Sequence, residues 1–152
     1  MEKRTIICHS EDETIKLATQ LARLAKAGDT FALYGTLGMG KSVFARGFIQ
    51  SLTNAEEVPS PTFTLVQSYE APNFEIYHFD LYRLKSPDEI FELGMEEALY
   101  EGVCLIEWPE KMGGYLPKNC FSIQISAHPE GREISITSTS AEKISRLQDL
   151  SL

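Results

Sequence analysis

Apolar residues recur along the chain in two kinds of pattern, short strand-like runs and the wider spacing that marks one face of a helix. The short runs predict strands at residues 4–9, 31–34, 64–70, 74–81, 102–107, 119–127 and 133–139. The helical spacing, with its caps and glycine breaks, predicts helices at residues 11–27, 43–52, 87–93, 95–100 and 141–150. Strand–helix units thus mix with hairpins, which indicates an α/β fold whose central sheet is parallel in the middle and antiparallel toward its edges.

A glycine-rich loop, Gly35-Thr-Leu-Gly-Met-Gly-Lys-Ser42, joins the second predicted strand to the second predicted helix. Gly35, Gly38 and Gly40 can adopt backbone conformations closed to other residues, so successive N–H groups can turn toward phosphate oxygens. Lys41 then reaches the outer phosphates, and Ser42 offers its hydroxyl to Mg²⁺. The spacing predicts a P-loop for a nucleoside triphosphate, in a P-loop NTPase-like three-layer fold with a mixed, partly parallel central sheet. The alternative is a glycine-rich turn with a solvated lysine.

Length and composition limit the class of protein. The 152 residues predict a single domain, 1–152, and the content of 43% hydrophobic and 24% charged residues is typical of a soluble globular protein. No apolar stretch is long enough for a membrane span or a signal peptide, so we expect a cytoplasmic location and no membrane partner. Cys8, Cys104 and Cys120 are odd in number and widely spaced, which favours reduced core cysteines over a disulfide or a metal site.

The net charge of −8 limits the partners that the chain can bind directly. Nucleic-acid binding normally uses clustered lysine and arginine, and the sequence contains no such cluster. We therefore expect no DNA binding. A role in nucleic-acid chemistry would require a second, more basic protein to make most of the contacts.

Two carboxylates end predicted strands, which is where ligands bind in α/β folds of this kind. Glu107 follows an apolar run at 103–106, the pattern of a Walker B acid that holds the magnesium shell or orients a water. Asp80 ends the strand-like run at 76–80, and that pattern equally fits a cap on the following turn.

Three further features have both a functional and a structural interpretation. The segment Ser60-Pro-Thr-Phe63 can present Ser60 or Thr62 to the γ-phosphate as a switch-like loop, or it can be an ordinary loop. His78 shares a face with Asp80 on a regular strand, and it is equally consistent with a hydrogen-bonded core histidine. Arg83 can neutralise phosphate charge or pair with a nearby carboxylate.

Five motifs, taken in order, carry a resemblance to a known family. They are Gly35-Thr-Leu-Gly-Met-Gly-Lys-Ser42, Ser60-Pro-Thr-Phe-Thr-Leu-Val66, His78-Phe-Asp-Leu-Tyr-Arg-Leu84, Glu92-Leu-Gly94 and Leu105-Ile-Glu-Trp-Pro-Glu110. With this set the chain resembles the TsaE (YjeE) family, bacterial ATPases of tRNA threonylcarbamoyladenosine biosynthesis. The resemblance implies binding and hydrolysis of ATP with Mg²⁺, in a cytoplasmic complex with the TsaB and TsaD proteins. It also implies support for modification of the adenosine beside the anticodon, with contact to the tRNA only through the complex.

Carried over residue by residue, the resemblance assigns the main roles at the site. Lys41 and Ser42 match the family's phosphate and magnesium positions, and Glu107 matches its magnesium-site acid. Asp80 matches the acid of the His-x-Asp-x-Tyr-Arg motif, which is important for hydrolysis in the family, and Thr62 lies in the Ser-Pro-Thr loop. The implied catalytic residues are Lys41, Thr62, Asp80 and Glu107.

Residues outside these positions complete the implied nucleotide site. Trp108 matches the family's aromatic residue after the acid, Glu11 falls where the family's capped helix approaches the nucleotide, and Gly131-Arg132 resembles the family's hairpin Gly-Arg. The implied nucleotide-binding set is Glu11, Gly35, Gly38, Met39, Gly40, Lys41, Ser42, Val43, Trp108 and Arg132. One departure is Thr36, where the family usually has an acid. The absence of that charge leaves open the intrinsic rate of ATP hydrolysis and the details of docking to the partner proteins.

Other functions remain open at this point. A small P-loop kinase acting on a metabolite would need clustered lid arginines, but the six arginines, at positions 4, 23, 46, 83, 132 and 146, are scattered. A GTPase would need an Asn-Lys-x-Asp motif, which the sequence lacks. A nucleotide-gated assembly module that does not hydrolyse ATP fits the same motifs.

Overall fold

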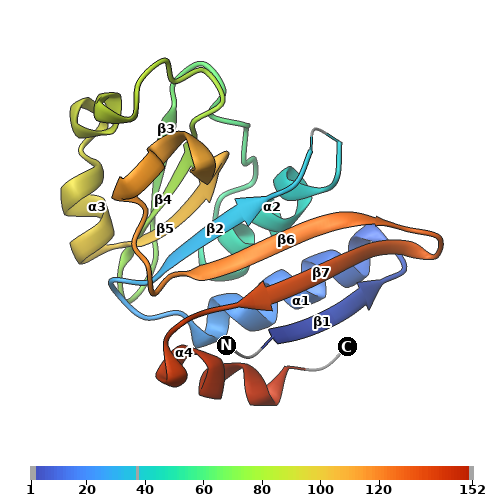
Figure 1. Ribbon diagram of the computed structural model, residues 1–152. Helices are drawn as coiled ribbons and strands as arrows, with labels where there is room; N and C mark the ends of the chain where they lie inside the picture. The colour runs from blue at the N-terminus through green and yellow to red at the C-terminus, as the bar shows by residue number, and fades with distance from the viewer. Residues whose placement is uncertain (1–2, 37, 151–152) are drawn as a thin grey trace.

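The computed structural model describes residues 3–36 and 38–150 and contains a seven-stranded mixed sheet with helices around it (Figure 1). The strands are β1 Lys3–Cys8, β2 Thr30–Tyr34, β3 Val66–Glu70, β4 Glu75–Asp80, β5 Val103–Glu107, β6 Phe121–His128 and β7 Gly131–Thr137. The α-helices are α1 Glu11–Leu24, α2 Lys41–Leu52, α3 Met95–Glu101 and α4 Ala141–Arg146. Three 3₁₀ segments complete the described part, η1 Pro87–Leu93, η2 Pro109–Tyr115 and η3 Leu147–Asp149.

The strand order β1-β7-β6-β2-β5-β4-β3 places the strand before the P-loop in the middle of the sheet. β2 pairs in parallel with β5 and β6, and β4 pairs in parallel with β5. The outer pairs β1–β7, β6–β7 and β3–β4 are antiparallel. The predicted arrangement, parallel near the P-loop and antiparallel toward the edges, is confirmed.

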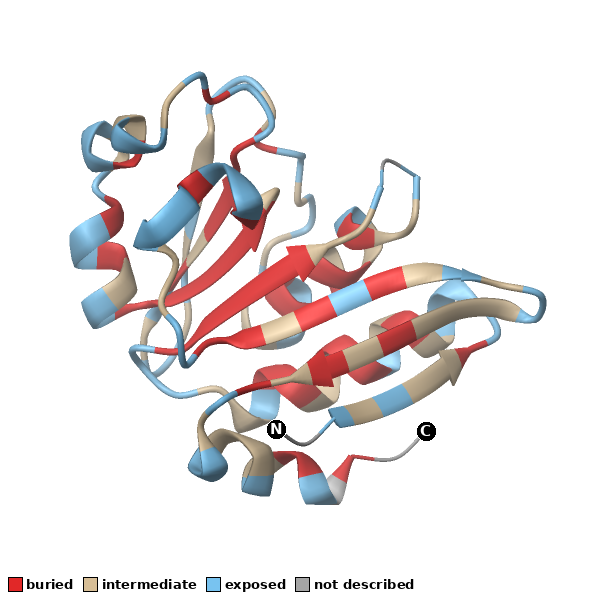
Figure 2. Cartoon of the chain, viewed as in Figure 1, coloured by how far each residue is buried: buried red, intermediate tan, exposed pale blue. Residues whose placement is uncertain are grey.

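Two apolar cores lie on opposite faces of the central strands and confirm the three-layer architecture. Along β5, Val103 and Leu105 pack into the core formed with α1 and α2, whereas Cys104 and Ile106 pack into the core formed with η1, α3 and η2. Burial on both faces explains why β5 is apolar at every position before Glu107. Figure 2 shows this contrast, since β5 is buried throughout while β6 and β7 alternate.

Several element boundaries differ from those that the sequence predicts. The first helix ends at Leu24, before Gly28, because the chain turns into extended backbone at Ala25. The strand predicted from 64 begins at Val66, after a turn and a positive φ of 68° at Leu65. The terminal helix stops at Arg146 and continues only as a 3₁₀ turn, and η2 has no counterpart in the predicted elements.

The cysteine and membrane expectations can also be compared with the structure. Cys8, Cys104 and Cys120 are buried free cysteines, as predicted. Within the described ranges, no helix combines the length and the apolar character that a membrane span requires.

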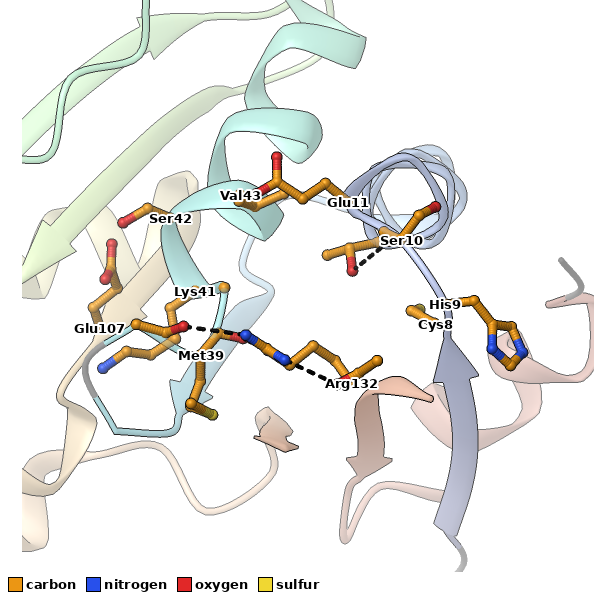
Figure 3. Close-up of a pocket in the computed structure, with 14 residues that line it drawn as sticks. Cys8, His9, Ser10, Glu11, Met39, Lys41, Ser42, Val43, Glu107 and Arg132 are labelled. Carbon is orange, nitrogen blue, oxygen red and sulfur yellow. Dashed lines mark hydrogen bonds between the residues drawn. The ribbon is translucent and has the colours of Figure 1, made fainter. Parts of the chain in front are cut away.

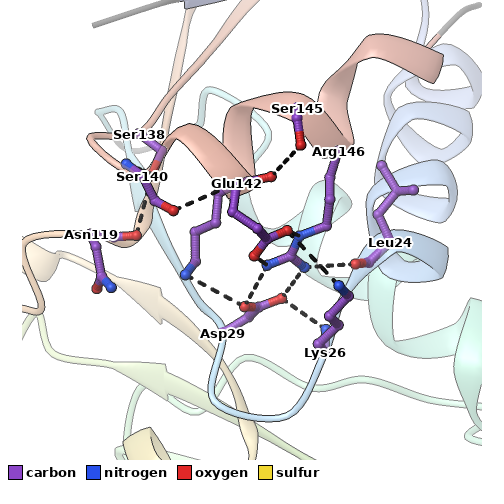
Figure 4. Close-up of polar contacts among 10 residues, drawn as sticks. Leu24, Lys26, Asp29, Asn119, Ser138, Ser140, Glu142, Ser145 and Arg146 are labelled. Carbon is purple, nitrogen blue, oxygen red and sulfur yellow. Dashed lines mark hydrogen bonds and ion pairs between the residues drawn. The ribbon is translucent and has the colours of Figure 1, made fainter.

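A buried ion pair fastens the C-terminal helix α4 to the start of β2 (Figure 4). The Arg146 guanidinium donates to both oxygens of Asp29, with N–O distances of 2.6 and 3.1 Å, and also to the Leu24 carbonyl at 2.8 Å. Asp29 is 3% exposed, and its carboxylate also accepts a hydrogen bond from the Lys26 amide. Removing one partner of such a pair strands a buried charge, which costs more than the pair itself contributes.

We expect Asp29→Ala to lower the free energy of unfolding by roughly 3 kcal/mol, because it removes the buried one of the two carboxylates that bind the Arg146 guanidinium and leaves only the exposed Glu142. Glu142→Gln is the matched control. It removes the exposed partner of the same arginine and should cost about 1 kcal/mol or less. Urea unfolding of both variants measures the difference. Equal losses would contradict a structural role for burial of the Asp29 pair.

Candidate functional site

A cavity of about 410 Å³ opens where the amino ends of α1 and α2 approach the start of β7 (Figure 3). It therefore borders the loop that the sequence identifies as a P-loop. The residues that line it come from four segments far apart in the sequence: Cys8, His9, Ser10, Glu11, Thr14, Gly38, Met39, Gly40, Lys41, Ser42, Val43, Glu107, Gly131 and Arg132.

The loop before α2 has the unusual backbone that its glycines allow. Gly38 and Gly40 have φ values of 82° and 104°, in the region that a side chain disfavours. At Gly35, φ is 148° and an added Cβ would lie 2.7 Å from the Ile125 carbonyl oxygen, so β6 packs directly against the start of the loop. Leu37, within the same motif, lies outside the described residues.

Arg132 joins this loop to the hairpin of β6 and β7. Its Nε donates to the Met39 carbonyl at 3.1 Å, and Nη2 lies 3.5 Å from the Gly38 carbonyl. Figure 3 shows the side chain reaching from the start of β7 to the loop. These hydrogen bonds satisfy carbonyl oxygens of the loop on the side of Arg132. They therefore favour a loop conformation in which the backbone N–H groups of the loop do not have to pair with those carbonyls.

The two helices that border the cavity differ at their amino ends. Ser10 caps α1 by accepting from the Glu13 amide at 3.2 Å, and its first turn carries three acids, Glu11, Asp12 and Glu13. The α2 helix has no side-chain cap on Gly40 and no acid in its first turn, which instead begins with Lys41. Its first N–H groups and its positive dipole end are therefore free to face an anion supplied from outside.

Lys41 is the central electrostatic feature of the site. The residue is 5% exposed, and its Nζ is a buried donor with no hydrogen-bond partner in the described structure. Burial lowers the pKa of Lys41, while the charges of Glu107, Glu110 and Asp80 act to raise it. A buried ammonium without a partner is costly, and a polyanionic ligand in the cavity would supply the missing oxygens.

The two candidate acids lie next to each other across neighbouring strands. Asp80 and Glu107 are register partners in the parallel β4–β5 pair, so both point to the face of the sheet that carries α1 and α2. Glu107 lines the cavity and is 4% exposed, and its Oε2 lies 2.7 Å from the Nε2 of His78. His78 is therefore a hydrogen-bonded core histidine that also orients the candidate metal ligand.

Asp80 joins the Ser60–Thr62 loop to the site. Its Oδ2 accepts from the Thr62 hydroxyl at 3.1 Å and lies 3.5 Å from the Ser60 hydroxyl. Its Oδ1 accepts from the Tyr82 amide at 3.0 Å, so Asp80 also caps the turn after β4. The structure therefore confirms the cap on the following turn, and a role of this carboxylate toward a ligand stays a prediction.

The structure brings most of the candidate residues together. Nine of them line the cavity: Glu11, Gly38, Met39, Gly40, Lys41, Ser42, Val43, Glu107 and Arg132. Four lie outside its lining: Gly35, Thr62, Asp80 and Trp108. Of these, Thr62 and Asp80 contact each other, and the Trp108 ring lies 3.9 Å from the Nζ of Lys41. The Arg83 guanidinium lies over the exposed Phe63 ring, 4.4 Å from its centroid, and it forms no ion pair with a carboxylate among the residues that the structure describes.

Sequence reasoning missed four residues that line the cavity, Cys8, His9, Ser10 and Thr14, whereas Gly131 belongs to the Gly-Arg pair that the resemblance points to. The sequence identifies Ser10 as a helix cap, and nothing in a capping box says that the capped end faces a ligand cavity. The signal that points there is the approach of β7 to the end of β1, where Arg132 and Cys8 are register partners. That pairing is not visible in the sequence, because the two residues are more than a hundred positions apart.

Comparison with known proteins gives the family. Residues 8–134 match the family described as "Threonylcarbamoyl adenosine biosynthesis protein TsaE". The chain belongs to the TsaE family. It is similar to the tRNA threonylcarbamoyladenosine biosynthesis protein TsaE of Rickettsia felis, with 43% identity over 139 residues that make up 90% of this chain and 81% of that relative. The protein of the same name from Bacillus subtilis is 36% identical over 148 residues, 92% of each chain.

The TsaE assignment also agrees with the fold. The crystal structure of Bacillus subtilis YdiB superposes with a TM-score of 0.75 and 30% identity, covering 97% of this chain and 92% of that one. The P-loop NTPase-like α/β architecture expected from the sequence is therefore confirmed, as is the resemblance to the TsaE family.

We expect Lys41→Met to raise the free energy of unfolding of the ligand-free TsaE chain by about 1 kcal/mol, because the buried ammonium has no hydrogen-bond partner and its contact with the Trp108 ring offsets only part of its desolvation. Methionine keeps most of the length of the apolar stem. Lys118→Met, at an exposed position, is the control and should change the free energy by less than about 0.5 kcal/mol. Urea unfolding without nucleotide measures both variants, and a destabilised Lys41→Met variant would contradict an unsatisfied ammonium.

Proposed function

We propose that the chain is a magnesium-dependent ATPase that supports threonylcarbamoylation of the adenosine beside the anticodon of tRNA. One observation carries the nucleotide part of this proposal: the Lys41 ammonium, which has no hydrogen-bond partner among the described residues, lies at the uncapped, acid-free amino end of α2. The Lys41 ammonium and the amino end of α2 would both be stabilised by an anion. The loop before them has the motif and the glycine conformations of a phosphate-binding loop. The place in tRNA modification rests on membership of the TsaE family.

The residues present fit a magnesium ion held together with phosphate. Among the residues that the structure describes, no group of three or more His, Cys, Asp or Glu side chains could hold a metal alone. Mg²⁺ at nucleotide sites commonly takes only one or two protein ligands and completes its shell with phosphate and water. The Ser42 hydroxyl and the Glu107 carboxylate line the same cavity and are the ligands that we propose. The ion would neutralise charge that develops on the phosphates.

Asp80 and Thr62 supply the polar groups beside the proposed metal ligand. Asp80 is 5% exposed and neighbours Glu107 across the sheet, and the Thr62 hydroxyl donates to it. We propose that Asp80 acts in hydrolysis, by holding the attacking water or the metal shell, and that Thr62 positions its Oδ2. This role needs the acid only in the chemical step, so it separates hydrolysis from binding.

The proposed partners are the TsaB and TsaD proteins. With a net charge of −8, the chain is poorly suited to hold tRNA itself, and another subunit would supply that contact. Arg132 is the one arginine on the described lining of the cavity, and its Nε and Nη2 already point to loop carbonyls. A partner that encloses the γ-phosphate would therefore raise the rate, as added charge stabilisation does in related phosphoryl transfer.

Binding and chemistry should separate in two isosteric variants. We expect Asp80→Asn to reduce single-turnover hydrolysis at least about 100-fold with ATP affinity within about threefold of wild type. Glu107→Gln should lose hydrolysis and also the gain in ATP affinity that Mg²⁺ gives. Asp88→Asn, at an exposed position in η1, is the control and should behave as wild type. Calorimetry and rapid-quench assays in the partner complex decide the assignment, which wild-type rates in both variants would contradict.

Dependence on partners distinguishes this function from a metabolite kinase. We expect feeble ATP turnover by the chain alone and at least about tenfold stimulation by added TsaB and TsaD, because the cavity is open and its arginine is engaged. Turnover is measured against the concentration of the partner pair, with a parallel screen for phosphorylated metabolites. A phosphorylated small molecule together with no stimulation would favour the kinase.

A further inference from the structure

The Lys41 ammonium lies over an aromatic ring, although acids are close to it. Its Nζ is 3.9 Å from the centroid of the Trp108 ring. Glu107 is the acid whose charge acts most strongly on this lysine, yet the described structure contains no hydrogen bond from the Nζ to it. The face of an indole ring attracts a cation most strongly where water is excluded, as it is at this buried atom.

The backbone at Trp108 is arranged to hold the ring there. Trp108 has a φ of 59° and a ψ of 49°, the left-handed conformation that is disfavoured for a bulky side chain. The ring is half-buried, packs against the core on the α3 side and lies 5.0 Å from the Tyr82 ring. A strained residue that the surrounding packing maintains is a reason to look for function.

Glu107 is held in a corresponding way by a different neighbour. Its Oε2 is engaged with the Nε2 of His78 at 2.7 Å, and His78 is 2% exposed, so this contact is well shielded from water. The lysine and the acid therefore each have a separate holder. If they paired with each other, the empty site would neutralise the two charges that the nucleotide and its metal require.

We propose that Trp108 is a positioning residue that holds the Lys41 ammonium in the ligand-free site and so prevents its ion pair with Glu107. The inference rests on the proposed function, in which Lys41 binds the triphosphate. When phosphate binds, the ammonium exchanges its contact with the Trp108 ring for phosphate oxygens. No buried salt bridge with Glu107 has to break first. Trp108 thereby acts on affinity through the state of the empty site, in addition to any contact with the nucleotide.

A double-mutant cycle separates this role from direct contact with ATP. Calorimetry in EDTA measures ATP affinity without the metal, for the wild type, Trp108→Leu, Glu107→Gln and the double variant. We expect Trp108→Leu to weaken affinity about tenfold in the wild-type background and less than twofold in the Glu107→Gln background, where the competing carboxylate is gone. Trp108→Phe keeps a ring and should stay within about threefold of wild type.

Two results would overturn the proposal. A loss of equal size in both backgrounds would mean that Trp108 acts by touching the nucleotide, and no loss in Trp108→Leu would mean that it does not act on binding. A wild-type chain that binds no ATP contradicts the proposed function, and the contact between Lys41 and Trp108 is then tested without nucleotide.

That second test uses fluorescence, because Trp108 is the single tryptophan of the chain. An ammonium 3.9 Å from the ring changes the electric field at the indole, so the ligand-free wild type and Lys41→Met should differ in emission. Lys118→Met is the control and should match the wild type. Identical emission from the wild type and Lys41→Met would overturn the proposal. This test does not use Trp108→Leu, so it decides the proposal even if that variant does not fold.

Discussion

The structure around the cavity depends on one constraint, a positive charge buried at the end of a helix that is itself positive. Lys41 begins α2, where the helix dipole opposes a cation, and burial excludes the water that would otherwise solvate it. The surroundings accommodate this charge without a direct ion pair: three acids act on it through space, and an aromatic ring faces it. The result is a buried charge without a hydrogen-bond partner in the described structure, and the proposed binding of a nucleotide rests on it.

The strand ends complete the same arrangement. Because β4 and β5 run parallel in register, Asp80 and Glu107 reach the same edge of the sheet on the same face. A slip by one residue would send either acid to the opposite core, among Phe79 and Ile106. The apolar residues that precede each acid therefore do more than fill a core, since their alternation fixes where the two carboxylates emerge.

The order of strand-like and helical patterns along the whole chain predicted the α/β class, and local patterns predicted the hairpins, the P-loop motif and both strand-end acids, because each of these is encoded in one short stretch of consecutive residues. The neighbours of these groups could not be predicted in the same way. The left-handed backbone of Trp108, the His78–Glu107 contact and the Arg132 bonds to the P-loop follow from packing between distant segments. Local propensity also gave no sign that α1 ends at Leu24, where Ala25 turns to extended backbone, or that η2 follows the left-handed Trp108.

The ion pair between Asp29 and Arg146 gives the fold a physical boundary that differs from the boundary of the family match. The match stops at residue 134, within β7, yet α4 beyond it supplies the arginine for Asp29, and Leu147 and Leu150 pack into the core shared with α1 and α2. A chain cut where the match ends would leave a buried carboxylate at the start of β2, the strand that leads directly into the P-loop. In evolutionary terms, the segment after residue 134 can drift in sequence only while it still delivers one cation and two apolar side chains to that end of the sheet.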